Sequence, residues 1–146
     1  MADRQPFAEY AHRLLALAET GSLTACVSAL SFSNLYYILR KLKGHADTLT
    51  LLRQLKSLVQ ILPVTDTEIT AAFSSSFKDF EDAIQYFAAK ADGHIIAIVT
   101  RNRADYSGSQ IPVVSPDEFL PPVRPKARAS RCIGVISLPD LEVSVF

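Results

Sequence analysis

Hydrophobic and polar positions along the chain alternate between helical and strand-like spacing. Residues 6–19 carry apolar side chains at the three- and four-residue intervals of an amphipathic helix, and Gly21 follows as a stop signal. Residues 23–30 (LTACVSAL) are short and mostly apolar, which is typical of a buried strand. Ser31 can then cap a helix that runs to residue 43. The opening of the chain therefore predicts helix, strand and helix in that order.

The alternation continues with a predicted helix over residues 47–56. The apolar residues 58–64 follow as a strand, and Pro63 restricts it to an edge or a strand end because proline cannot donate to the ladder. Thr65 and Glu68 have the spacing of a capping box, which predicts the start of a short helix.

The pattern repeats once more toward residue 120. Asp79 predicts the N-cap of a helix over residues 80–90, and residues 95–99 (IIAIV) predict a buried strand. A short strand is predicted at residues 111–114. The cap, first and third positions of a last short helix are predicted at Ser115, Pro116 and Glu118.

Strands separated by helices, each strand apolar throughout, indicate an α/β fold with a mostly parallel sheet that is covered on both faces. One domain is predicted for residues 1–120, because a chain of 146 residues is too short for two domains of ordinary size. Residues 121–146 form a C-terminal extension in which a proline- and arginine-rich linker (PPVRPKARAS) precedes an apolar tail. The tail is either disordered or a strand that docks on the domain or on a neighbour.

Three polar clusters lie directly after predicted strands or at predicted helix starts, so they are predicted to meet at the carboxyl edge of the parallel sheet. Ligands bind at this edge in such sheets. Carboxylates gathered there suit hard divalent cations, which can activate water against a phosphodiester. The same residues have plainer interpretations, because acidic residues also cap helix starts and occur in ordinary turns. The clusters are Ser31 with Asn34, Asp79 with Asp82, and Thr100, Arg101, Asn102 and Asp105.

Charge and cysteine content narrow the function classes. Lysine plus arginine equal aspartate plus glutamate at 15 each, so any contact with nucleic acid must be local. Cys26 and Cys132 match no metal-ligand spacing and are too few for a disulfide framework, which is typical of a cytoplasmic protein. Charges near the N-terminus interrupt any signal peptide, and no apolar run reaches the roughly 18 residues of a membrane span.

Residues 79–120 carry an acidic helix start (DFEDAIQYFAAKADG), a strand that ends in a Thr-Arg-Asn turn (HIIAIVTRNR) and an Asp-aromatic pair (ADYSGSQ). This stretch resembles the C-terminal half of PIN-domain proteins, and VSALSFSNLYYILRKLKG upstream is similar to their strand-to-helix passage. The resemblance covers about residues 4–120. It implies a three-layer Rossmann-like sheet and a Mg²⁺- or Mn²⁺-dependent ribonuclease, often the toxin of a toxin–antitoxin pair of the virulence-associated-protein-C type. RNA, an antitoxin protein and a second copy of the chain are the partners it implies.

The resemblance also implies roles for individual positions. Asp82 lies where the family keeps a catalytic metal-site carboxylate, and Asp105 lies in its terminal acidic turn. Asn34 and Asn102 stand where many members have a glutamate and an aspartate, and an amide adds no negative charge to hold a cation. The metal ligands expected from the resemblance are Asp82, Asp105, Asn102 and Asp79. The expected substrate contacts are Asn34, Thr100, Arg101 and Arg103, with the arginines on phosphates.

One family feature is missing from the sequence. Family members usually begin with an apolar strand that ends in an Asp-x-Asn turn and supplies the most central carboxylate, whereas this chain opens at the predicted first helix. The fold is therefore expected to lack its N-terminal strand. The apolar tail could fill the vacant position by β-augmentation, but Pro139 argues against a central strand. Two alternatives to an active enzyme follow: a non-catalytic interaction or oligomerisation module, and a truncated product whose start lies upstream of Met1.

Overall fold

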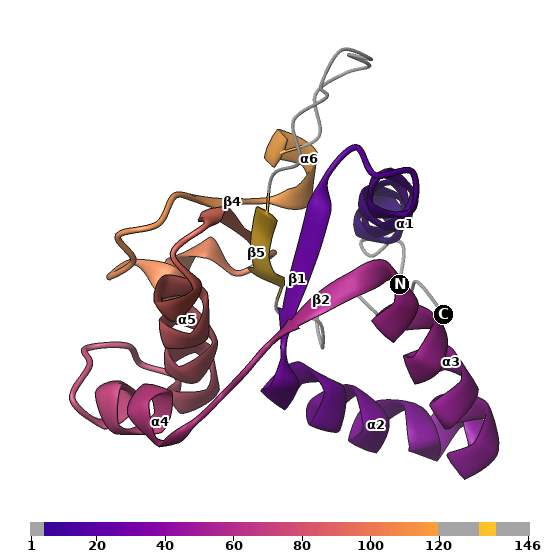
Figure 1. The fold of residues 1–146 in the computed structure, drawn as a ribbon, viewed down its shortest axis with the longest axis horizontal. Helices are drawn as coiled ribbons and strands as arrows, with labels where there is room; N and C mark the ends of the chain where they lie inside the picture. The colour runs from indigo at the N-terminus through magenta and orange to yellow at the C-terminus, as the bar shows by residue number, and fades with distance from the viewer. Residues whose placement is uncertain (1–4, 120–131, 137–146) are drawn as a thin grey trace.

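A five-stranded parallel sheet forms the centre of the molecule, with helices on both of its faces (Figure 1). The computed structural model describes residues 5–119 and 132–136. The strand order is β2-β1-β5-β3-β4, which confirms the predicted α/β class. The strands are β1 (Thr24–Ser28), β2 (Val59–Leu62), β3 (Ile95–Val99), β4 (Val113–Val114) and β5 (Cys132–Ile136). The helices are α1 (Gln5–Glu19), α2 (Ala29–Lys43), α3 (His45–Leu58), α4 (Asp66–Phe73), α5 (Phe80–Asp92), the 3₁₀ helix η2 (Arg103–Tyr106) and α6 (Pro116–Phe119).

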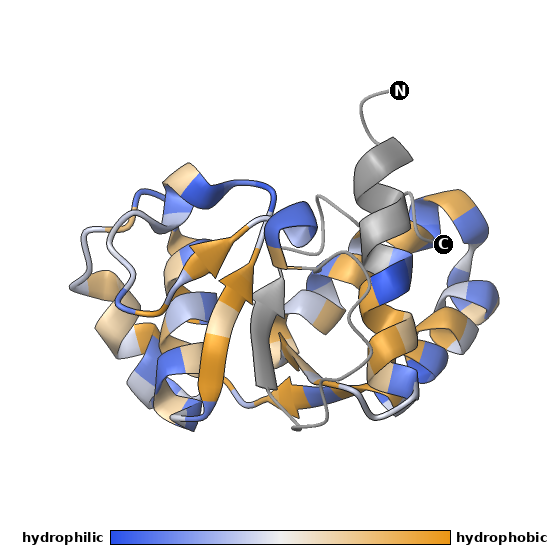
Figure 2. Cartoon of the chain, turned by 90° about the horizontal axis from the view of Figure 1, so that it is seen from above, coloured by the Kyte–Doolittle hydropathy of each residue, from blue (hydrophilic) through white to orange (hydrophobic). Residues whose placement is uncertain are grey.

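Successive residues of β1 point to opposite faces of the sheet. Ala25 and Val27 belong to a buried cluster with residues of α1, α2 and α3, whereas Cys26 packs with Ala88 and Ala89 of α5. Each face therefore has its own helices, and Figure 1 shows α1 to α3 on one side and α4 and α5 on the other. Figure 2 shows β3 hydrophobic along most of its length, and β1 is buried from Ala25 to Ser28. Within the described residues, no helix combines the length and the apolar character that crossing a membrane requires.

The central strand of the sheet comes from the C-terminal part of the chain. β5 pairs in parallel with β1 on one side and with β3 on the other, so it joins the two halves of the sheet. Figure 1 shows it between these strands, at the yellow end of the colour scale. Pro139 does not bear on this strand, because β5 ends at Ile136, before the proline. Pro139 itself lies outside the described residues.

Most helix starts follow the chemistry predicted from the sequence. Thr65 and Glu68 form the predicted capping box of α4, in which the N–H of Thr65 donates to Oε1 of Glu68 at 2.7 Å. The predicted cap of α2 is wrong: its N-cap is Ser28, whose hydroxyl accepts from the N–H of Ser31 at 3.3 Å. Both serines are suitable caps. The ladder between β1 and β2 ends at Ser28, and this long-range pairing selects the earlier one.

Candidate functional site

The start of α2, the start of α5 and the turn after β3 meet at one edge of the sheet. β1 runs directly into α2, and β3 runs into the turn before η2, so both of these segments follow the carboxyl end of a strand. The strands β1, β5 and β3 are parallel, so β1 and β3 end at the same edge of the sheet. α5 leads into β3 and runs in the opposite direction along the sheet, so it begins at this edge. The three polar clusters predicted from the sequence lie on these segments.

The first turn of α5 carries the acidic residues of the candidate site. Asp79 is the N-cap, as predicted, and its Oδ1 accepts a hydrogen bond from the N–H of Asp82 at 3.0 Å. Asp82 is buried, with 9% of its surface exposed, whereas Asp79 and Glu81 are exposed. A buried carboxylate is unfavourable unless hydrogen-bond donors or opposite charges compensate for its lost hydration. The partners of Asp82 are therefore the centre of this site.

Tyr106 of η2 supplies one of these donors. Its hydroxyl donates to Oδ1 of Asp82 at 3.1 Å and lies 3.4 Å from Oε1 of Gln85, one turn further along α5. The side chain is 2% exposed, and its ring lies edge-on to Phe77 with the centroids 5.9 Å apart. Burial, and then the charge of Asp82, raise the pKa of Tyr106 far above its ordinary value. The hydroxyl therefore stays protonated and remains a donor at neutral pH.

Carboxylates gather around this hydroxyl without forming a three-ligand metal site. The charges of Asp79 and Asp105 also raise the pKa of Tyr106, so both lie in its electrostatic neighbourhood. Among the residues that the structure describes, no three histidine, cysteine, aspartate or glutamate side chains are grouped to hold an ion. The donor set still fits Mg²⁺, which is commonly held by one or two carboxylates and keeps several waters. The ligand roles of Asp82, Asp105, Asn102 and Asp79 stay predictions.

A hydrogen bond between Asn34 and Glu81 joins α2 to α5. Nδ2 of Asn34 donates to Oε1 of Glu81 at 3.1 Å. The negative charge that an amide lacks is therefore present beside Asn34, on the neighbouring helix. Sequence reasoning missed Glu81, although its position directly before Asp82 was a signal. The contact of Asn34 with a substrate stays a prediction.

The turn after β3 is organised by Thr100. Its side chain is fully buried, and its Oγ1 accepts from the N–H of Asn102 at 3.1 Å. The carbonyl of Asn102 in turn accepts from the N–H of Asp105 at 3.0 Å, which starts η2. This burial gives Thr100 a structural role in the turn and does not support the predicted contact with substrate. Arg101 is partly exposed and stays a predicted contact.

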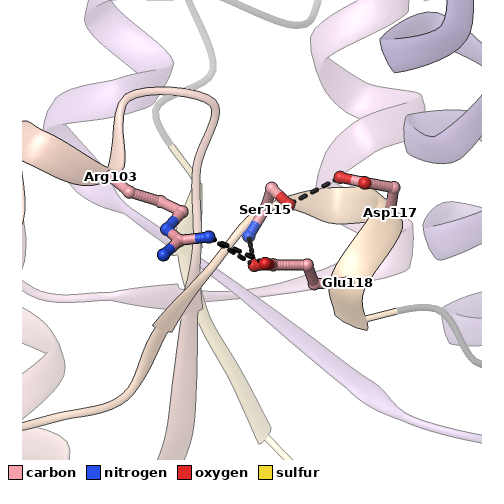
Figure 3. A network of polar contacts seen from close by, with 4 residues as sticks. All are labelled: Arg103, Ser115, Asp117 and Glu118. Atoms are coloured by element: carbon pink, nitrogen blue, oxygen red, sulfur yellow. Dashed lines mark hydrogen bonds and ion pairs between the residues drawn. The ribbon is translucent and has the colours of Figure 1, made fainter.

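Arg103 is held by Glu118 of α6 (Figure 3). Nη1 of Arg103 lies 2.8 Å from each carboxylate oxygen of Glu118, and the two side chains are 52% and 47% exposed. Oε1 of Glu118 also accepts from the N–H of Ser115 at 3.0 Å, as the predicted helix start requires. The Ser115 N–H, and then the charge of Arg103, hold the pKa of Glu118 below its ordinary value. Glu118 therefore stays ionised at neutral pH and fixes one nitrogen of the guanidinium.

Residues 1–104 of the chain match the family model described as PIN domain. The chain belongs to the PIN domain family. PIN domains generally have a nucleic-acid-binding nuclease fold and usually depend on divalent metals. The matched residues include Asn34, Asp82 and Asn102 and end just before Asp105. The family match therefore does not support a role for Asp105, and the support for that role is its position beside Tyr106. No curated protein and no solved structure matches the chain.

Replacing Tyr106 by phenylalanine should destabilise this PIN domain through one hydrogen bond. The ring stays in place, but a buried carboxylate loses a donor. Hydrogen bonds to charged groups contribute about 1.5–3 kcal/mol, so a loss of that size in the free energy of unfolding is expected for Tyr106→Phe. Urea denaturation followed by circular dichroism measures it.

Tyr86→Phe is the matched control. Tyr86 is as buried as Tyr106, at 3% exposure, but its hydroxyl accepts from the backbone N–H of Gln110 at 3.1 Å and not from a charged group. A neutral hydrogen bond contributes about 1 kcal/mol, so the control should lose less. Equal losses in the two variants would show that the Tyr106 hydroxyl has no special relation to Asp82.

Proposed function

We propose that this PIN domain is a divalent-metal-dependent endoribonuclease of the toxin–antitoxin type. The observation that carries the proposal is the buried carboxylate of Asp82, which accepts from the Tyr106 hydroxyl at the carboxyl edge of the sheet. Burying a carboxylate is costly, and at the ligand-binding edge of a parallel sheet such a group favours a functional role. Membership of a family whose fold is generally a nuclease directs that role to the cleavage of a phosphodiester.

In the proposed site, Asp82 and Asp105 hold a Mg²⁺ or Mn²⁺ ion, and Asp79 and Asn102 support it. When bound, such an ion activates a water molecule and neutralises charge on the phosphate. Asp79 contributes by capping α5, because its bond to the N–H of Asp82 fixes the backbone that carries the central carboxylate. Tyr106 contributes by keeping that carboxylate in one orientation.

The proposed substrate is RNA, and it lies across the exposed polar side chains of the same edge. Arg101 and Arg103 would contact its phosphates, and the amide of Asn34 would contact the RNA from α2. An antitoxin protein and a second copy of the chain are the protein partners that this type of toxin requires, and the cytoplasm is the place of action.

A non-catalytic interaction module is the second candidate, and two observations favour it. Amides occupy positions 34 and 102. The described residues also contain no group of three acidic or other metal-binding side chains. Such a module would keep the PIN fold and its protein partners while lacking tight metal binding.

Removal of divalent metal tests the enzymatic proposal directly. The full chain should cleave single-stranded RNA in the presence of Mn²⁺ or Mg²⁺, and an excess of EDTA should abolish cleavage, because the water is activated by the ion. Titration calorimetry with Mn²⁺ in the absence of RNA should show one binding site. Neither cleavage nor Mn²⁺ binding by a folded chain would overturn the enzymatic proposal in favour of the non-catalytic module.

A further inference from the structure

An open groove lies beside the acidic site, along η2 and the connection that leads to β4. It has a volume of about 640 Å³, and Arg103, Tyr106, Ser107 and Gln110 are among its lining residues. We infer that this groove binds one nucleotide of a single-stranded RNA, next to the phosphodiester that the acidic site cleaves. The inference rests on the proposed function, whose substrate it describes in more detail.

Tyr106 belongs to both the groove and the acidic site. Its hydroxyl binds Asp82, while the same residue lines the groove. Asp105, the second proposed metal ligand, lies in η2 between the groove residues Ala104 and Tyr106. The groove therefore shares Tyr106 with the acidic site and lies next to Asp105 in the chain, which places it near the bond that the site would cleave.

The charge of the groove differs from that of the acidic site. No carboxylate is among its lining residues, and the charged residue there is Arg103. Glu118 uses Nη1 of Arg103, whereas the other two nitrogens of the guanidinium point away from that carboxylate in Figure 3. A guanidinium presents its donors in one plane, which suits phosphate oxygens. Arg103 thus offers a phosphate two guanidinium nitrogens that Glu118 does not use, whereas the acidic site carries carboxylates.

The other lining side chains suit a nucleobase. Ile111 and Val113 contribute partly buried apolar surface, which can pack against the face of a base. Gln110 is exposed, and its amide offers one acceptor oxygen and two donor hydrogens to a base edge. Its backbone N–H donates to the Tyr86 hydroxyl at 3.1 Å, so the side chain extends from a held position. A base whose edge is read in this way must be unpaired, which favours single-stranded RNA.

The test is the binding of a fluorescently labelled single-stranded RNA of mixed sequence to the full chain, measured by anisotropy in EDTA. Without metal no cleavage occurs, so affinity is measured separately from activity. Gln110→Ala should weaken binding by about three- to tenfold, since one hydrogen bond contributes about that factor. Arg103→Ala should weaken binding and lower the slope of log affinity against log salt by about one, as the loss of one phosphate contact requires.

Two controls separate binding from structure. Glu118→Gln breaks the same ion pair as Arg103→Ala but keeps the cationic side chain, so RNA affinity should stay equal or rise. Gln54→Ala replaces an exposed glutamine of α3 by alanine, as Gln110→Ala does in the groove, and should leave the affinity for RNA unchanged. Thermal unfolding of each variant checks that it is folded, and Gln110→Ala remains informative even where Arg103→Ala is unstable, because its exposed side chain makes no hydrogen bond to the described residues.

The outcomes for the groove and for the nuclease are distinguishable. RNA binding that weakens in Gln110→Ala and Arg103→Ala supports the groove, even where the wild-type chain cleaves nothing. RNA binding and cleavage by the wild type that neither substitution changes overturn the groove while the nuclease stands. Equal losses in Arg103→Ala and Glu118→Gln also overturn it, because they would assign the effect to the link between η2 and α6. The wild-type chain failing to bind any RNA in EDTA overturns it as well.

Discussion

Replacing Asp82 by asparagine is expected to lower the rate of metal-dependent RNA cleavage by about 100-fold or more. Even residues that only support a metal ligand change affinity or activity by about 10–100-fold, so loss of the central ligand's charge should reach the upper end of this range. Asparagine has nearly the same shape, and its amide oxygen can still accept from the Tyr106 hydroxyl. The substitution therefore removes charge while the local packing remains.

Cleavage rates under single-turnover conditions and Mn²⁺ calorimetry measure this effect. Asp47→Asn is the matched control, because Asp47 is an exposed acid in the first turn of α3, on the other side of the sheet from α5. It should cleave RNA at the wild-type rate. A contaminating nuclease has to be excluded first. Cleavage by pure Asp82→Asn at the wild-type rate would then mean that Asp82 holds no catalytic ion.

Removing residues 120–146 is expected to abolish cooperative unfolding of the remaining chain. β5 lies between β1 and β3, and the pairing pattern of the described strands includes no direct ladder between these two. Without β5, several backbone groups at the centre of the sheet lose their partners, and each such group costs about 1–3 kcal/mol. The sum is comparable with the whole stability of a domain, about 5–15 kcal/mol. Differential scanning calorimetry measures the loss.

A shorter truncation provides the control for this prediction. A chain that ends at Ile136 retains β5 and should unfold with a cooperative transition. Gly134→Pro in the full-length chain tests the same strand with one substitution, since a proline in a central strand removes a ladder hydrogen bond. A chain of residues 1–119 with the transition of the full-length protein would contradict the central position of β5.

The local part of the fold could be predicted because its signals act over a few residues. The strand predicted at residues 95–99 is β3. Pro63 predicted an edge strand or a strand end, and β2 both lies at the edge of the sheet and ends at Leu62, directly before the proline. The capping box at Thr65 and the cap at Asp79 are present as hydrogen bonds. In each case the chemistry that defines the element lies within one turn or one strand of the sequence.

The candidate site could be predicted only in part. The sequence placed Asp79 and Asp82 at a helix start near the turn that contains Asp105. Burial, and then the charges of all three, raise the pKa of the Tyr106 hydroxyl, which binds Asp82. It did not predict that Tyr106 would donate to Asp82, because an Asp-aromatic pair does not reveal where the hydroxyl points. Glu81 was missed for a similar reason, since its partner Asn34 lies on another helix.

The sequence by itself determined the succession of helices and strands up to residue 119, the caps of α4 and α5 and the membership of the PIN family, because periodicity, capping chemistry and family motifs are local properties. Only the tertiary structure decided that β5 lies at the centre of the sheet, that Ser28 caps α2 and that Arg103 pairs with Glu118. These outcomes depend on pairing between residues that are far apart in the chain. The energy of such pairing depends on the geometry of the whole sheet, which no short stretch of sequence contains.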